Sequence, residues 1–127
     1  MIGEVLVDPR VIHGVELFNA HDFFECHDVF EEYWNELRGS EKLSIQGLIQ
    51  TAVGCYHAMN GNFKGAASQF DKAQNKLALH SPRMFGLDDA GLVEKVQAMK
   101  ASALRCKDNP GLDFQADLIP ALCWIST

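Results

Sequence analysis

The chain has 127 residues, 47% of them hydrophobic, and a formal net charge of −6 at pH 7. This length predicts a single domain over residues 1–127 with a substantial core. The acidic charge argues against nucleic acid and anionic lipid surfaces as partners. The first ten residues have an early glutamate and no cationic stretch before an apolar one, so they do not resemble a signal peptide.

The cysteines are widely spaced and form no C-x-x-C pair. Two of them, Cys26 and Cys55, fall inside apolar patterns, where a free cysteine behaves as a small hydrophobic residue. We therefore expect reduced thiols and a cytoplasmic location.

The N-terminal part of the chain predicts two helices. Asp8 and Pro9 are typical of a helix start, and the first helix is expected to reach about Phe18. Asp22 is expected to cap the second helix, with Glu25 three residues later in a capping-box pattern. The second helix is expected to run to Gly39. Its apolar seam, at spacings of four and three, contains Phe23, His27, Phe30, Trp34 and Leu37, which predicts a core position for the histidine.

The stretch between Lys42 and Lys64 contains no charged residue and predicts the central helix. A helix without charge on any face is normally buried on all sides, and this run is too short and too polar to span a membrane. At about 100° per residue it divides into three stripes. The first stripe has large apolar side chains: Leu48, Ala52, Cys55 and Met59, with Ile45, Ile49 and Tyr56 beside them. The second has small side chains: Gly47, Thr51, Gly54 and Ala58. The third is polar and consists of Gln46, Gln50 and His57, with Val53 among them. Because buried polar groups need partners, the third stripe predicts a site.

The remaining chain predicts two further helices and an apolar tail. The fourth helix is expected over about Phe63–Leu79, and Asp88 or Asp89 is expected to cap the fifth. Pro120 should limit the tail to short turns over the bundle. The fold class is therefore all-α, with about five helices: two stacked antiparallel helical hairpins, a fifth helix and a packed C-terminal tail.

The two hairpins are expected to be related by an internal repeat. A shift of forty residues places Gly14 on Gly54 and Phe30 on Phe70. The pattern resembles that of tetratricopeptide helix pairs, although two copies are too few for a solenoid. We interpret it as evidence for stacked hairpins.

The residues with the clearest chemical potential are a histidine and a carboxylate one helical turn apart. His27 and Glu31 lie on one side of the second helix, and an antiparallel third helix would bring His57 near His27 and Gln50 near Glu31. Two histidines and a carboxylate would hold a divalent Zn, Mn or Fe ion with an open position for water. The alternative is a hydrogen-bond network that fixes how the hairpins dock. Both interpretations remain open.

The chain resembles a known protein family at Phe18-Asn19, at Phe23 through Trp34, at Gln46 through Ala52, and at His57 and Gly61-Asn62. This is domain-of-unknown-function family 309, a small all-helical family sometimes labelled predicted metal-dependent hydrolases. The resemblance covers about residues 18–77 and implies the fold most firmly. It also implies functional positions at Glu25, His27, Glu31, Trp34, Gln46, Gln50 and His57. Asp28 departs from the glutamate that is usual in the family.

Two functions follow as hypotheses. In the first, the domain is a metal-dependent hydrolase in which His27, Glu31 and His57 hold the metal. The metal would lower the pKa of a bound water, with Glu31 as ligand or catalytic base, and Glu25, Trp34, Gln46 and Gln50 would bind the substrate. In the second, the domain is a non-catalytic interaction module that uses the concave side of the hairpins. The expected partner is a small molecule or a protein, with a homo-oligomer left open.

Overall fold

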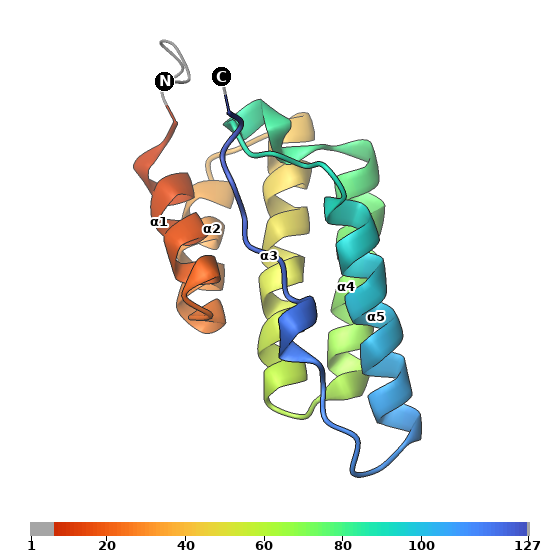
Figure 1. The fold of residues 1–127 in the computed structure, drawn as a ribbon. Helices are drawn as coiled ribbons and strands as arrows, with labels where there is room; N and C mark the ends of the chain where they lie inside the picture. The colour runs from red at the N-terminus through yellow and green to blue at the C-terminus, as the bar shows by residue number, and fades with distance from the viewer. Residues whose placement is uncertain (1–6, 127) are drawn as a thin grey trace.

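The computed structural model describes residues 7–126, and its secondary structure there is helical (Figure 1). The helices are α1 (Pro9–Asn19), α2 (Phe23–Trp34), α3 (Gly39–Met59), α4 (Phe63–Leu79) and α5 (Leu92–Asp108), with short 3-10 helices η1 (Pro82–Phe85) and η2 (Ala116–Leu118). The predicted all-α fold is confirmed. Among these helices, none has the length and apolar character that crossing a membrane requires.

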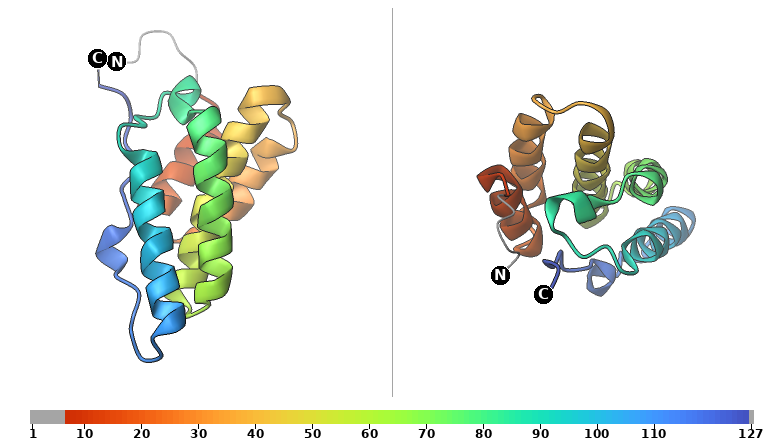
Figure 2. Two further views of the ribbon diagram at one scale, coloured as in Figure 1. Left: turned by 90° about the vertical axis from the view of Figure 1, so that its right-hand side faces the viewer. Right: turned by 90° about the horizontal axis from the view of Figure 1, so that it is seen from above.

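The five helices follow one another in an arc, each packed on its neighbour in the chain. Figure 2 shows this arc from above, with η1 and the C-terminal segment in its opening. The central helix α3 packs on both α2 and α4. The chain therefore forms two hairpins, α1–α2 and α3–α4, followed by α5.

A glycine in the first helix of each hairpin lies against a phenylalanine in the second. A Cβ atom built on Gly14 would collide with the ring of Phe30, and one built on Gly54 would lie 2.5 Å from Cε1 of Phe70. Both rings are fully buried. The two pairs are forty residues apart, as the internal repeat predicts, because each hairpin uses the same close approach between its helices.

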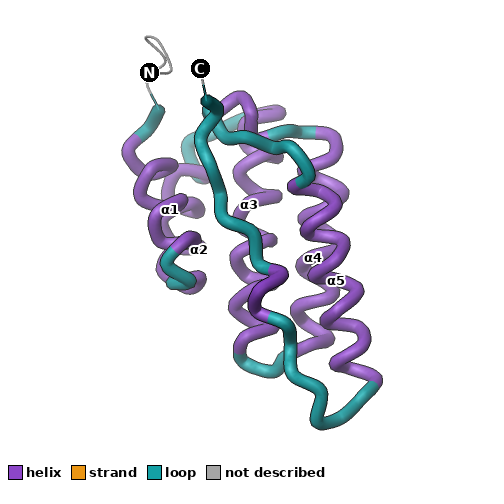
Figure 3. Tube along the Cα trace, viewed as in Figure 1, coloured by secondary structure: helices purple, strands orange, loops and turns teal. Residues whose placement is uncertain are grey.

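The C-terminal segment packs on the concave side of the arc. It runs back along the bundle from the end of α5 towards η1 (Figure 3). Asn19 fixes it to α1: its Oδ1 accepts a hydrogen bond from the backbone N of Leu122 at 2.8 Å, and its Nδ2 donates to the Leu122 carbonyl at 2.9 Å. Leu122 is buried, and Phe114 stacks on Phe70 at 6.4 Å between ring centroids. The concave surface expected to serve an interaction module is thus covered by this chain's own tail.

Two expected helix ends are wrong, the end of the second helix and the start of the fifth. The second helix ends at Trp34, and the next helix, α3, begins only at Gly39, whose φ of +61° is the left-handed conformation that glycine tolerates. Asp22 occupies the N-cap position of α2, as predicted, but its side chain makes no capping hydrogen bond. The fifth helix starts at Leu92 after Gly91, with φ +71°, because the Asp88 carboxylate accepts from the Ala90 backbone instead of capping it.

The central helix is buried on two of its three stripes. The small stripe and most of the large apolar stripe are covered, but Tyr56 and Met59 are 39% and 49% exposed. The polar stripe is half-buried, and the His27 side chain that faces it is 27% exposed. The expectations of burial on all sides, and of a core position for His27, are therefore wrong. Neighbouring helices cover the two flanks of α3 and leave its polar stripe open.

Candidate functional site

The open stripe of α3 forms the floor of a hollow between α2 and α4. The hollow has a volume of about 330 Å³, and we call it the α3 hollow. Its polar and aromatic lining is His27, Glu31 and Trp34 from α2, Gln46 and Gln50 from α3, and Gln69 from α4, with Ile49 and Val53 between them. Five side chains that the sequence singled out therefore converge on one cavity.

The charged part of the α3 hollow is the pair of His27 and Glu31. Their Nε2 and Oε2 atoms are 2.9 Å apart, and the other ring nitrogen, Nδ1, lies 3.3 Å from Oδ1 of Asp28. A doubly protonated ring can donate to both carboxylates, and a neutral ring to one. The Glu31 side chain is 51% exposed, so the pair belongs to the rim of the cavity rather than to the core.

Two polar atoms of the lining are buried without a partner. These are Nε1 of Trp34, a donor, and Oε1 of Gln50, an acceptor. Buried polar atoms are normally paired, and an unpaired one costs about 1–3 kcal/mol. The ammonium of Lys42 lies 4.1 Å from the centroid of the Trp34 ring, which fixes one side of the indole. The hollow therefore offers unused hydrogen-bonding capacity beside an acid–base pair.

His57 lies close to the α3 hollow but outside its lining. Its Nδ1 is 3.3 Å from Nδ2 of Asn62, at the start of α4. It shares a smaller, mostly apolar recess of about 160 Å³ with His27, Val53 and Tyr56. Within residues 7–126, no three His, Cys, Asp or Glu side chains form a group that could hold a metal ion. The structure brings His27 and Glu31 together and does not add His57 to them.

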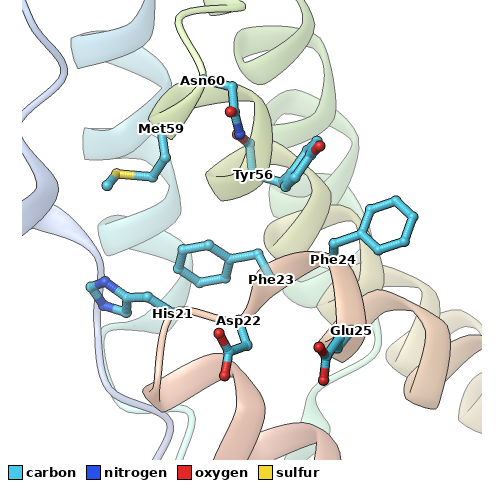
Figure 4. Close-up of a pocket in the computed structure, with 8 residues that line it drawn as sticks. All are labelled: His21, Asp22, Phe23, Phe24, Glu25, Tyr56, Met59 and Asn60. Carbon is cyan, nitrogen blue, oxygen red and sulfur yellow. The ribbon is translucent and has the colours of Figure 1, made fainter.

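Glu25 also lies apart from the α3 hollow. It lines a recess at the turn between α1 and α2, with Phe24 and Tyr56 (Figure 4). The sequence reading missed Gln69, which reaches the hollow from α4. Its signal is a polar residue one turn from the buried alanines Ala66 and Ala73, on the edge of the α4 face that packs on α3.

Burial makes the thiols of Cys26 and Cys55 poor nucleophiles. Burial raises the pKa of the Cys26 thiol to about 12, and burial likewise raises the pKa of the Cys55 thiol. Since the thiolate is the reactive form, both residues serve as small core side chains.

Comparison with known proteins shows a family similarity over the segment that carries this site. Residues 11–69 match the family model described as "Domain of unknown function (DUF309)". Over this segment, the chain is similar to the DUF309 family. The resemblance drawn from the motifs is confirmed, and the DUF309 segment contains every polar side chain that lines the α3 hollow.

A curated relative extends the similarity beyond that segment. The chain is 33% identical over 88 residues to the "Uncharacterized protein YpuF" of Bacillus subtilis (strain 168). The match covers 67% of this chain and 51% of that protein. The chain thus spans about half the length of the curated relative that it matches.

Proposed function

We propose that the α3 hollow binds a small, neutral, polar molecule and that the His27–Glu31 pair provides acid–base chemistry towards it. The proposal rests on one observation, that polar side chains from two helices line a single cavity. His27, Glu31 and Trp34 come from α2, and Gln46 and Gln50 from α3, yet all five line the same cavity of about 330 Å³. Ligand sites are typically concave, with a few convergent polar groups among apolar ones.

The lining also indicates the kind of ligand. Three glutamine amides and an indole N–H offer both donors and acceptors, whereas the cavity is lined by one carboxylate and no Lys or Arg. A planar group such as an amide or urea carries a matching donor and acceptor. Trp34 Nε1 and Gln50 Oε1 are shielded from solvent, so pairing them requires a small side-chain rotation when the ligand enters.

The geometry of the His27–Glu31 pair supports a role in proton transfer. The 2.9 Å contact between His27 Nε2 and Glu31 Oε2 orients the imidazole, as a carboxylate does for catalytic histidines. Glu31 is exposed enough to exchange protons with solvent. The expected step is proton transfer to or from the bound group.

The test is NMR titration of the ¹⁵N-labelled protein with acetamide and N-methylurea, using acetate as an anionic control. The amide probes should shift the backbone resonances of Gln46, Gln50 and Val53, and Gln50→Leu should abolish the shifts. Ser68→Leu, at an exposed position on α4, is the matched control and should keep them. Shifts of equal size in both variants, or none in the parent, would contradict the proposal.

The second candidate is the metal-dependent hydrolase suggested by the family label. It is favoured by one distance: Zn–N and Zn–O bonds of about 2.0–2.1 Å place two neighbouring ligands of a tetrahedral ion about 3.3 Å apart, so the 2.9 Å between His27 Nε2 and Glu31 Oε2 would have to widen only slightly. These two residues would hold the ion, with water or substrate completing the shell. A bound Zn, Mn or Fe ion would lower the pKa of its water and polarise a substrate oxygen.

A further inference from the structure

The mostly apolar recess beside the α3 hollow, which we call the apolar recess, is not used by the function proposed above. Its volume is about 160 Å³, and it is lined by Phe23, Phe24, His27, Val53, Tyr56 and His57. We propose that the α3 hollow and the apolar recess bind the two ends of one ligand, a small amide that carries an apolar group the size of a phenyl ring. This inference rests on the proposed function and adds the apolar end of its ligand.

The two cavities are neighbours because they share two side chains. His27 of α2 and Val53 of α3 line both of them. Towards the start of α2, beyond His27, the wall is Phe24 of the apolar recess, and towards its end the wall is Glu31 of the α3 hollow. The cavities therefore follow one another between α2 and α3, with His27 at their junction.

Aromatic side chains form most of the wall of the apolar recess. The ring centroid of Phe24 lies 5.6 Å from that of Tyr56 (Figure 4) and 6.1 Å from that of His27. Tyr56 in turn meets the ring of His57 at 5.9 Å and 61°. Centroid distances of about 4.5–7 Å with tilted planes are favourable for aromatic pairs. The wall therefore consists of mutually packed rings, and these offer a flat apolar group a surface of its own kind.

The size of the apolar recess indicates which group fits. An enclosed apolar cavity of about 150 Å³ binds benzene, and the recess has a volume of about 160 Å³. Its rings also retain unused surface, since Phe24 and Tyr56 are 57% and 39% exposed. Exposed apolar side chains gathered at one place mark an interaction site. A single phenyl ring suits this space, whereas a stable protein interface needs more than about 1,000 Å² of buried area.

His57 is held in one orientation by the N-cap of α4. Oδ1 of Asn62 accepts a hydrogen bond from the backbone N of Gly65 at 3.0 Å, so Nδ2 of Asn62 is the atom that lies 3.3 Å from Nδ1 of His57. An amide NH₂ group can only donate. In the neutral ring Nδ1 is therefore the acceptor and Nε2 carries the proton. This wall of the recess is thus oriented before a ligand arrives, which lowers the entropic cost of binding.

The positions of the two cavities set the length of the ligand. Gln50 lines the α3 hollow and Tyr56 lines the apolar recess. They are six residues apart on α3, which is about 9 Å along the helix axis. A short chain of methylene groups between the amide and the ring spans most of this distance. The chain would pass His27 and Val53, so the bound amide lies on the Glu31 side of the imidazole.

The experiment is NMR titration of the ¹⁵N-labelled protein with 4-phenylbutanamide and with butanamide, which is the same molecule without the ring. Both should shift the backbone resonances of Gln46 and Gln50, and only the phenyl compound should also shift those of Phe24 and Tyr56. The phenyl compound should bind at least ten times more tightly than butanamide. Phe24→Ala should reduce this affinity ratio at least fivefold. Leu79→Ala shortens an exposed apolar side chain outside the recess, and should leave the ratio unchanged.

Equal affinities for the two amides, or equal losses in Phe24→Ala and Leu79→Ala, would overturn the proposal. Shifts at Gln46 and Gln50 from both amides, with none at Phe24 and Tyr56, would overturn it and leave the proposed function standing. Shifts at Phe24 and Tyr56 alone would contradict the proposed function as well. At least tenfold tighter binding of N-acetyl-phenylalanine methylamide than of 4-phenylbutanamide would assign the recess to a phenylalanine of a partner protein instead. The spectra also report whether each variant is folded.

Discussion

Gly54 of α3 lies directly against the aromatic ring of Phe70 on α4. A Cβ atom at position 54 would be 2.5 Å from Cε1 and 2.6 Å from Cδ1 of that ring. The ring is completely buried, so it has no free space in which to move aside. The distance between α3 and α4 is therefore set by the absence of a side chain at position 54.

We expect Gly54→Leu to destabilise the protein by about 1–3 kcal/mol or more, because overpacking a filled core forces side chains and helices apart. The free energy of unfolding from urea denaturation measures this. Ala101→Leu, at an exposed position on α5, is the control and should change stability by less than about 0.5 kcal/mol. A Gly54→Leu midpoint at or above that of the parent would mean that the two helices do not approach closely.

Metal binding at His27 and Glu31 should raise the stability of the folded protein. If His27 and Glu31 chelate Zn²⁺ or Mn²⁺, the metal should stabilise the protein by about 2.7 kcal/mol at a free concentration one hundred times Kd. The gain in melting temperature should vanish in His27→Ala and Glu31→Gln and persist in His13→Ala.

The response of His57→Ala decides how many residues bind the metal. Since His57 is not grouped with the pair, we expect the metal effect to persist there. Loss of the effect in His57→Ala would show a three-residue site that forms only when the ion binds. An equal response in every variant would indicate adventitious surface binding.

The contact between His27 and Glu31 should contribute little to folding. With side chains 27% and 51% exposed, a pair one helical turn apart is expected to add about 0.3–0.5 kcal/mol. A double-mutant cycle of His27→Leu and Glu31→Leu, measured by urea denaturation, gives this coupling energy. A coupling above about 2 kcal/mol would indicate a structural network and argue against a functional pair.

The N-cap of α1 predicts an acid dependence of stability. Hydrogen bonds from the Arg10 side chain and backbone lower the pKa of Asp8 below its ordinary value. A carboxylate with a lowered pKa stabilises the folded state above its unfolded pKa of about 3.9, and this contribution is lost as the pH falls through the folded value. The stability difference between the parent and Asp8→Asn should therefore be constant at neutral pH and shrink below about pH 4. Urea midpoints at several pH values test this, and a difference that grows on acidification would contradict it.

The helices could be predicted from sequence because their signals are local. The amphipathic pattern predicts the fourth helix over about Phe63–Leu79, and α4 has these bounds. The second helix ends at Trp34, five residues before the glycine expected to stop it. The fifth helix begins after Gly91, whose positive φ allows the chain to turn without a capping side chain.

The lining of the α3 hollow could be predicted only in part, because the predicted set includes His57 and Glu25, which lie outside it, and lacks Gln69. Spacing shows which residues share a helix face, and this was enough to select His27, Glu31, Gln46 and Gln50. It does not show how far the neighbouring helices cover that face. Gln69 and the exposure of His27 depend on the position of α4 relative to α2, which no local pattern encodes.

The hydrogen bonds between Asn19 and Leu122 also bear on the order in which the molecule folds. They join residues 103 positions apart, whereas each helix otherwise packs mainly on the next one in the chain. Contacts between sequence neighbours form quickly, and the entropy of closing a long loop delays distant ones. Helices that are neighbours in the chain should therefore pack first, and the C-terminal segment should dock on them last. An Asn19→Ala variant should then unfold faster while folding at nearly the parental rate.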